Sequence, residues 1–479
     1  MQKNLVFYTF FYLGSLIFMR VCGILAKILL ARSITPYEYG LITLLIIALP
    51  GTFQIITNFC FFDILGHSVE GKKYFSFSLI YGTITTLIIA LIFFVYHEVI
   101  FQFLNIPDQS WVLYCSVLFG VLLSVTLGAI ITGILRGERS HFLAASFSTA
   151  PSILRLFFVI GIVYVFKITD FYLILLIFAL PPLVALIAVL IYKRKAIFDS
   201  FRSISIPDRG ILVFGFSFFI INTGISLSQN INSLVISHEL GIVWQGYFDV
   251  SMSLVAIISF FSGAIYLISA PETTTNSNES GQSDKHNVFA DIGRLLLSMC
   301  LLCVIIIYFY SHQIIGILFT SSYAPAGDYL VIVAIGYTIL FIQQYCAYLS
   351  ISNEKERISK ITWLTIATIA VFPVFAYILI LKFKFIGAYL AMTGLIIVYT
   401  VLTLILIKDK TPLHLLFCKG ERLGLSVVGT FLILYLLQIS FFFGLILSTV
   451  SFFIMIVLFG YIDKNVFTSL ISVKNVRNP

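Results

Sequence analysis

Charge is scarce in this sequence. Asp, Glu, Lys and Arg make up 10% of its 479 residues, whereas soluble globular chains carry about 25%. Apolar residues account for 60% of the chain, and its mean hydropathy is +1.07. So few charged side chains cannot cover the surface of a water-soluble protein of this length. The composition therefore excludes a soluble enzyme or a soluble nucleic-acid-binding domain. It indicates a polytopic membrane protein.

The sequence also lacks the side-chain groupings of a catalytic or metal centre. It has no paired carboxylates, no nucleophile elbow and no metal-ligand spacing. Cys300 and Cys303 form a C-x-x-C in an apolar run, but no His or second Cys pair accompanies them. They are therefore predicted to be small buried apolar side chains. We expect no enzyme activity, no cofactor and no metal site.

Long apolar runs occupy most of the chain. A run of about 20 residues is long enough for an α-helix to cross a bilayer. The sequence therefore predicts an all-α polytopic fold with about 14 transmembrane helices, the first of which is treated as a span and not as a cleaved signal peptide. The expected helices are 5–30, 40–62, 75–95, 111–134, 142–166, 171–192, 211–236, 244–269, 294–319, 328–351, 361–381, 386–407, 422–442 and 444–462.

The distribution of Lys and Arg predicts the topology. With the N-terminus in the cytoplasm, 22 of the 29 cations fall on the cytoplasmic side, four fall outside and three lie within spans. This asymmetry follows the positive-inside rule and supports an even number of spans. We expect a multi-pass protein of the cell (inner or plasma) membrane with both termini cytoplasmic. The net charge of +8 is then a topology signal, and no nucleic-acid partner is predicted.

Three cations fall inside the expected spans. Arg20 and Lys27 share one face of the first helix with Gly23 between them, and Arg155 lies near the middle of the fifth. Charges inside a bilayer are costly and often functional, so these residues are candidates for an anion site in a central cavity. The alternative is a structural role, in which each cation pairs with a carboxylate or with backbone carbonyls. Lys27 could also extend towards the outer surface.

The seventh expected helix is the most polar span. Asn222, Ser226, Gln229 and Ser233 recur on one face of it. Such a face could line an aqueous cavity that binds the hydroxyl groups of sugars, or it could form hydrogen bonds between helices. Asp249, early in the eighth helix, is the acidic candidate and a possible partner for a cation across the cavity.

The hairpin after Leu29 carries a motif, which comprises Leu30, Ala31, Arg32, Pro36, Glu38, Tyr39 and Gly40. It resembles the first-hairpin signature of the Wzx-type O-antigen and exopolysaccharide flippases, which belong to the multidrug/oligosaccharidyl-lipid/polysaccharide exporter superfamily. The chain departs from the signature at Ile34-Thr35, where Leu-Gly is usual. Segments 131–157 and 314–337 are also similar to that family; in the second, Tyr323 and Ala326 are kept and Thr320 replaces a Gly.

The hairpin returns in weaker form at residues 234–247, where Gly246 aligns with Gly40. Weak self-similarity over half a chain is typical of transporter repeats. The resemblance implies two six-helix bundles around a central lumen, which we place at 1–205 and 206–410. Residues 411–479 are expected to form two additional transmembrane helices, which match the family only by position, and a cytoplasmic tail.

The resemblance implies a flippase that moves an undecaprenyl- or dolichyl-pyrophosphate oligosaccharide from the cytoplasmic to the outer leaflet by alternating access. Besides membrane lipids, it implies polysaccharide polymerase and chain-length proteins as partners. The candidate lumen residues are then Arg20, Lys27, Arg155, Asn222, Ser226, Gln229 and Asp249.

Two other functions stay open. One is a cation-coupled multidrug exporter of the same superfamily, although such exporters usually carry an acidic residue in the first helix and this helix has none. The other is a membrane-embedded polysaccharide polymerase or ligase, although such enzymes typically need a sizeable outer loop and every expected outer loop here is short.

Overall fold

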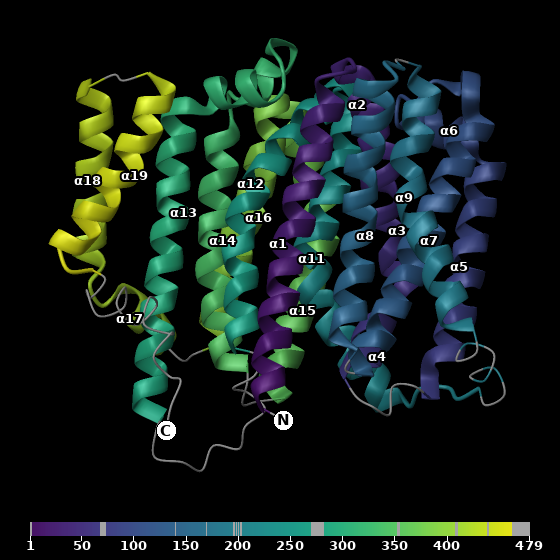
Figure 1. The fold of residues 1–479 in the computed structure, drawn as a ribbon, viewed down its shortest axis with the longest axis horizontal. Helices are drawn as coiled ribbons and strands as arrows, with labels where there is room; N and C mark the ends of the chain where they lie inside the picture. Colours follow the sequence, from purple (N-terminus) through teal and green to yellow (C-terminus); the bar gives the residue numbers. More distant parts are fainter. Residues whose placement is uncertain are drawn as a thin grey trace. The chain divides into compact units, whose positions relative to one another are not determined.

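The computed structural model describes most of the chain, with gaps at several loops and at the C-terminal tail. The described residues are 2–67, 73–138, 140–168, 170–194, 197, 199, 201, 204–269, 282–351, 355–407, 411–437 and 440–461. Within these ranges the protein is helical and contains no β-strand (Figure 1). The expected cytoplasmic tail after residue 461 lies outside them, as does much of the long polar loop before the ninth expected helix.

Helices coincide with all fourteen expected ranges. The long helices are α1 (Gln2–Ala31), α5 (Phe75–Val95), α7 (Trp111–Gly137), α8 (His141–Val159), α9 (Phe171–Tyr192), α11 (Arg209–Glu239), α12 (Ile242–Ser269), α13 (Gln282–Leu318), α14 (Leu330–Ile351), α15 (Lys355–Phe383), α16 (Phe385–Ile407), α18 (Gly420–Leu437) and α19 (Phe441–Leu458). Shorter elements are α2 (Pro36–Thr43), η1 (Leu44–Ala48), α3 (Leu49–Asn58), α4 (Phe61–His67), α6 (His97–Phe103), η3 (Asp108–Ser110), η4 (Ile160–Val165), η5 (Ser321–Ala326) and α17 (Thr411–Phe417). Apolar segments form helices because a helix satisfies its own backbone hydrogen bonds in the absence of water.

Among the described residues, 12 helices are long and apolar enough to cross a membrane, or up to 13 if the bent pair Arg209–Ile221 and Thr223–Glu239 forms one span. The all-α polytopic fold predicted from the sequence is therefore confirmed, whereas the exact number of 14 spans is not. The expected division of 422–462 into two helices corresponds to α18 and α19. The ninth expected span, 294–319, corresponds to the apolar part of α13, Ala290–Leu318, and the helix itself begins earlier, at Gln282.

The second expected helix, 40–62, is interrupted. Thr35 caps α2 through a reciprocal arrangement with Glu38, and Pro36 occupies the first turn, where its missing N–H is not needed. A π-helical segment, η1, joins α2 to α3, and α3 ends where Phe59 and Cys60 adopt left-handed backbone angles. Local π-helix is frequent at functional sites, and here it directly follows α2, which carries the second half of the hairpin motif.

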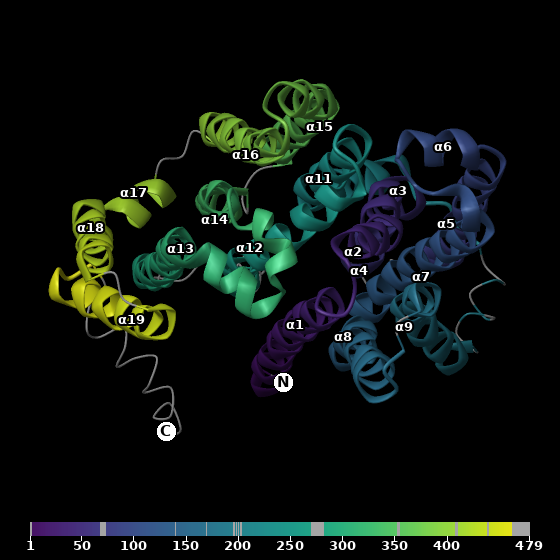
Figure 2. The same cartoon turned by 90° about the horizontal axis from the view of Figure 1, so that it is seen from above.

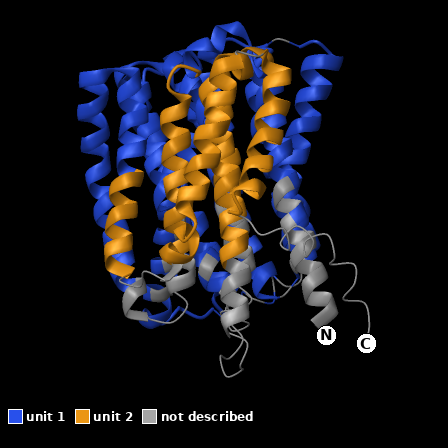
Figure 3. Ribbon diagram, turned by 90° about the vertical axis from the view of Figure 1, so that its left-hand side faces the viewer, with its two compact units in different colours: residues 1–254, 318–326, 358–395 blue, residues 255–317, 327–357, 396–479 orange. Residues whose placement is uncertain are grey.

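The chain divides into two compact units (Figure 3). Unit 1 comprises residues 1–254, 318–326 and 358–395, and unit 2 comprises 255–317, 327–357 and 396–479. The predicted boundaries at 205 and 410 are not those of these units, and the proposed division into two bundles and a C-terminal pair stays a prediction.

In unit 1, α7 contacts α3, α4, α5, α8 and α9, while α1 lies along α8 (Figure 2). A buried apolar cluster drawn from several of these helices includes Phe61, Ile130 and Phe147. Small residues allow close approach: Gly133 of α7 faces the backbone of Phe62, which leaves no room for a larger side chain.

In unit 2, α18 packs against α19. The phenol of Tyr310 on α13 lies against Gly444 on α19, where a side chain larger than hydrogen would collide with it. Arg294 of α13 anchors the C-terminal segment, because its guanidinium donates to the Leu415 carbonyl at 2.8 and 3.0 Å and pairs with Asp291 at 3.0 Å. The Tyr461 hydroxyl donates to the neighbouring Leu416 carbonyl, and burial raises the pKa of this phenol.

Candidate functional site

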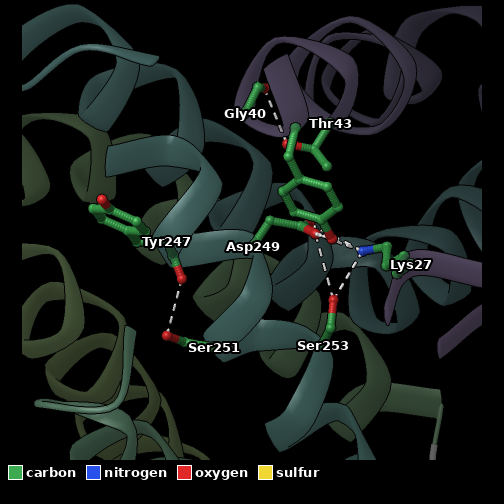
Figure 4. Close-up of polar contacts among 8 residues, drawn as sticks. Lys27, Gly40, Thr43, Tyr247, Asp249, Ser251 and Ser253 are labelled. Carbon is green, nitrogen blue, oxygen red and sulfur yellow. Dashed lines mark hydrogen bonds and ion pairs between the residues drawn. The ribbon is translucent and has the colours of Figure 1, made fainter. Parts of the chain in front are cut away.

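An ion pair joins two helices that are far apart in the sequence. The Lys27 ammonium on α1 donates to both carboxylate oxygens of Asp249 on α12, at 3.0 and 2.8 Å (Figure 4). It donates a third hydrogen bond to the Ser253 hydroxyl at 3.0 Å. Because an ammonium has three donors, all of those of Lys27 are occupied.

The acceptor side of the pair is also well partnered. The buried Tyr39 hydroxyl of α2 donates to Asp249 Oδ2 at 2.8 Å, and the Ser253 hydroxyl lies 3.4 Å from the same oxygen. The side chains of Lys27 and Asp249 are 19% and 9% exposed. We call these four residues, Lys27, Tyr39, Asp249 and Ser253, the α1–α12 polar cluster. Its charges cancel, which is the arrangement that makes a buried ion pair tolerable.

A close crossing of two glycines lies next to this cluster and holds α2 against α12. A Cβ on Gly40 would collide with the Ile242 carbonyl oxygen, and a Cβ on Gly246 would collide with the Pro36 carbonyl oxygen. The crossing is reciprocal, because each glycine faces the residue four positions before the other. The internal repeat predicted from the sequence thus aligns two residues that touch, and only glycine fits at either position.

Tyrosine rings cover the region around the crossing. Tyr323 of η5 packs edge-on against Tyr39, with ring centroids 5.8 Å apart, and against Tyr247 at 6.2 Å. Its hydroxyl faces the Ile34 carbonyl, 3.5 Å away, at the turn after α1. Burial, and secondarily the nearby Glu38 carboxylate, raises the pKa of Tyr323, so this phenol stays neutral. Tyr323 was noted from the sequence as part of a family-like segment, and the structure adds its place beside the hairpin.

The structure brings together two of the seven predicted site residues, Lys27 and Asp249. Lys27 does not extend towards the surface, as it could have done, because the carboxylate holds it. Arg20 lies two turns earlier on α1 and is exposed, and it has no hydrogen-bond or ion-pair partner among the described residues. Arg155 instead contacts α9: its Nε donates to the Phe178 carbonyl at 3.2 Å, and its guanidinium lies 4.3 Å from the Phe178 ring centroid. These contacts match the structural alternative for Arg155.

The predicted polar face of α11 is mixed. Ser226 is exposed and Gln229 is half-buried, while the side chain of Asn222 lies outside the described part of the structure. Two neighbouring asparagines make interhelical contacts: Asn232 donates to the Ala388 carbonyl at 3.0 Å, and the Asn230 amide lies against Gly51. This part of α11 therefore contains interhelical hydrogen bonding as well as one exposed hydroxyl, that of Ser226.

Sequence reasoning missed the roles of Tyr39 and Ser253. Tyr39 was noted only as a motif residue, although its aromatic ring with a hydroxyl suits a buried hydrogen-bond donor. Ser253 lies one helical turn after Asp249, a spacing that places both on one face of α12. That spacing was the available signal. In the described ranges, no three His, Cys, Asp or Glu side chains gather closely enough to hold a metal ion.

Solved structures of transporters share this fold. The chain is similar to a structure described as the lipid II flippase MurJ in an inward closed conformation, with 16% identity and a TM-score of 0.67 over 93% of this chain and 98% of that one. It is also similar to an inward-facing multidrug resistance MATE family transporter of the MOP superfamily, with 17% identity and a TM-score of 0.57 over 81% and 94% of the two chains. A MOP superfamily transporter from Pyrococcus furiosus matches with 14% identity and a TM-score of 0.52, over 84% and 96%. At these identities the likeness concerns the fold.

At the level of sequence, no curated protein matches the chain significantly. A family model described as polysaccharide biosynthesis protein matches residues 29–328. This match begins at the hairpin motif and includes its repeat and segment 131–157 in full, and it covers segment 314–337 as far as residue 328, past Tyr323 and Ala326. The protein is a multi-pass membrane protein, and the chain belongs to the polysaccharide biosynthesis protein family.

Proposed function

We propose that this protein flips a lipid-pyrophosphate-linked oligosaccharide from the cytoplasmic to the outer leaflet of the cell membrane. Membership of a polysaccharide biosynthesis family supports a glycan cargo, and the similar fold of a lipid II flippase supports a lipid-linked one. The carrier would be an undecaprenyl or dolichyl pyrophosphate. Alternating access between the two predicted bundles would move it.

Arg20 is the observation that carries this proposal. It is an exposed arginine on a mainly apolar helix, and α1 contains no acidic residue along its whole length. A lone guanidinium in a bilayer needs water or an anion. A pyrophosphate offers oxygens that match the planar donor fork of arginine. A cationic cargo would be repelled at this position.

The hydroxyl-rich part of the cargo requires different partners. Exposed Ser226 and half-buried Gln229 on α11 are the residues we assign to the sugar, with Asn222 on the same helical face. Arg155 would support the helix packing around this region through its contacts with Phe178. Polysaccharide polymerase and chain-length proteins would then act on the translocated lipid in the outer leaflet.

A leaflet-accessibility assay tests the proposal. A short-chain lipid-pyrophosphate oligosaccharide is placed in the inner leaflet of proteoliposomes, and its sugar is detected by an external lectin. Wild type should expose the sugar, Arg20→Ala should slow exposure at least tenfold, and Arg20→Lys should retain part of the rate. Arg209→Ala, which removes an exposed arginine at the start of α11, is the matched control and should transport normally.

The alternatives give different outcomes in the same system. A cation-coupled multidrug exporter, supported by the similar fold of a MATE family transporter, would accumulate cationic dyes and leave the lipid-linked sugar unmoved. A polymerase or ligase would change the length or the carrier of the glycan, which mass spectrometry of the recovered lipid detects. We expect the recovered lipid to be chemically unchanged, because we propose no catalytic step for this protein.

A further inference from the structure

The two cations on one face of α1 differ in their partners. Lys27 is neutralised by Asp249 and has all three of its donors occupied. Arg20 is exposed and has no acidic partner among the described residues. Lys27 lies seven positions after Arg20, which is about 10 Å along the helix axis. A diphosphate group bound at Arg20 would therefore lie within a short movement of the Lys27 ammonium.

The residue midway between the two cations on this face of α1 is a glycine. A side chain on Gly23, midway between them, would meet only the Ser152 hydroxyl, 3.8 Å away. The glycine thus leaves backbone, not a side chain, along the line from Arg20 to Lys27. Ser152 belongs to α8, which packs along α1, so a headgroup that follows this line contacts α8 as well as α1.

Asp249 holds Lys27 in the way an anionic ligand would. Its carboxylate presents two oxygens to the ammonium, and the Tyr39 hydroxyl supplies a further hydrogen bond to Oδ2. If a phosphate oxygen replaced the carboxylate at Lys27, Asp249 would keep its hydrogen bonds from Tyr39 and Ser253. The exchange therefore leaves the Asp249 carboxylate hydrogen-bonded but without its cation, and the binding of the phosphate at Lys27 must outweigh that cost.

We propose that Asp249 is a specificity-determining residue that occupies Lys27 until the anionic headgroup of the cargo displaces it. The displacement breaks the ion pair between α1 and α12 and releases one helix from the other. A neutral lipid cannot displace the carboxylate, so only a phosphate-bearing cargo triggers the release. This inference rests on the proposed flippase function and adds to it the step that couples headgroup binding to helix movement.

Thermodynamic linkage makes the inference measurable. If binding of the anion opens the ion pair, then opening the ion pair must strengthen binding of the anion by the same factor. Asp249→Asn removes the competing charge, retains the shape of the side chain and leaves Lys27 free. We expect this variant to bind undecaprenyl pyrophosphate about fivefold or more tightly than wild type, which is the lower end of typical coupling between sites.

The experiment uses the full chain in nanodiscs with undecaprenyl pyrophosphate and undecaprenol as probes. Binding is measured with radiolabelled lipid, and the α1–α12 separation is measured by pulsed electron paramagnetic resonance. Spin labels are attached at Leu25→Cys on α1 and Trp244→Cys on α12, both exposed, in a chain whose seven natural cysteines are replaced. Ser251→Ala, which removes a buried hydroxyl of α12 that bonds Tyr389 and not Lys27, is the matched control.

In wild type, undecaprenyl pyrophosphate should add a second, longer distance and undecaprenol should not. Asp249→Asn should show the longer distance without lipid, and Ser251→Ala should behave as wild type in both measurements. The charge swap Lys27→Asp with Asp249→Lys should restore the resting distance, which also guards against a folding defect in the single variant. These results together support the exchange.

Other results overturn it in distinguishable ways. If undecaprenyl pyrophosphate binds wild type without changing the distance, or binds Asp249→Asn no more tightly, the exchange is refuted and the flippase proposal survives. If the charge swap leaves the longer distance, the ion pair does not set the separation and the inference also fails. If undecaprenyl pyrophosphate does not bind at all, the proposed function fails together with the inference.

Discussion

Replacing Lys27 by Met should lower the free energy of unfolding substantially, although the volume of the side chain changes little. The substitution keeps a long unbranched side chain but leaves the buried Asp249 carboxylate without its cation. Removing one partner of a buried ion pair costs about 3–5 kcal/mol. The hydrogen bonds that Tyr39 and Ser253 still donate to the carboxylate offset part of this loss, so we expect a value at the low end, about 3 kcal/mol.

A double-mutant cycle separates this charge effect from packing. Asp249→Leu alone leaves the Lys27 ammonium with only the Ser253 hydroxyl, and should cost about as much as Lys27→Met. Combining the two should cost much less than their sum, because both charges are gone and an apolar pair of similar volume replaces them. The assay is reversible unfolding in mixed micelles, followed by circular dichroism, for wild type, both single variants and the double variant.

The coupling free energy between the two substitutions tests whether the ion pair holds α1 to α12. We expect the double variant to be at least 2 kcal/mol more stable than additivity would give, since residues in direct contact typically couple by about 0.5–3 kcal/mol. Tyr39→Phe is the control for loss of one hydrogen bond and should cost about 1 kcal/mol. If the two charge variants are additive within about 0.5 kcal/mol, the ion pair does not hold α1 to α12 and the reasoning is refuted.

Three further predictions follow from other contacts. Gly40→Ala should lower the thermal stability markedly, because the added Cβ would collide with the Ile242 carbonyl oxygen. The control is Gly161→Ala, where a Cβ meets nothing within 4 Å, and it should be neutral or stabilising. Equal effects of the two substitutions would contradict the close crossing. Arg155→Lys should lose the hydrogen bond to the Phe178 carbonyl and the contact with the Phe178 ring, which should lower the stability by about 1 kcal/mol while transport persists. Loss of transport in a stable variant would instead indicate that Arg155 binds the cargo. Burial raises the pKa of Tyr323 above its value in the unfolded chain, so the contribution of this residue to stability is present below pH about 10 and is lost as the pH rises further. Tyr323→Phe should therefore reduce the fall of the unfolding free energy at alkaline pH. An unchanged fall in this variant would refute the prediction.

The sequence by itself determined the class of the fold. Helix positions were predictable because each apolar run of the required length must satisfy its backbone hydrogen bonds within itself, whatever its neighbours are. For the same reason the split between α18 and α19 could be drawn from composition alone. The interruption of the second helix at η1 and the early start of α13 at Gln282 were not predicted, since they arise where local backbone and packing override the apolar pattern.

The hairpin motif and its weak repeat also came from the sequence, and they indicated the family. They did not reveal that Gly40 and Gly246 cross in contact, because self-similarity gives equivalent positions and no distance between them. The sequence similarly identified Arg20, Lys27 and Arg155 as one class of residue, cations within apolar helices. Nothing local distinguishes these three side chains, since each has apolar neighbours along its own helix.

Only the tertiary structure decided which of these cations is paired. Lys27 and Asp249 lie 222 positions apart and meet because α12 packs close to α1 and α2, with Gly40 and Gly246 in contact at the crossing. Arg155 meets Phe178 because α8 packs on α9, and Arg20 is left exposed on the same face of α1 as Lys27. Local sequence sets the helices, since their hydrogen bonds are local, whereas the partner of a buried charge depends on long-range packing that no single segment encodes.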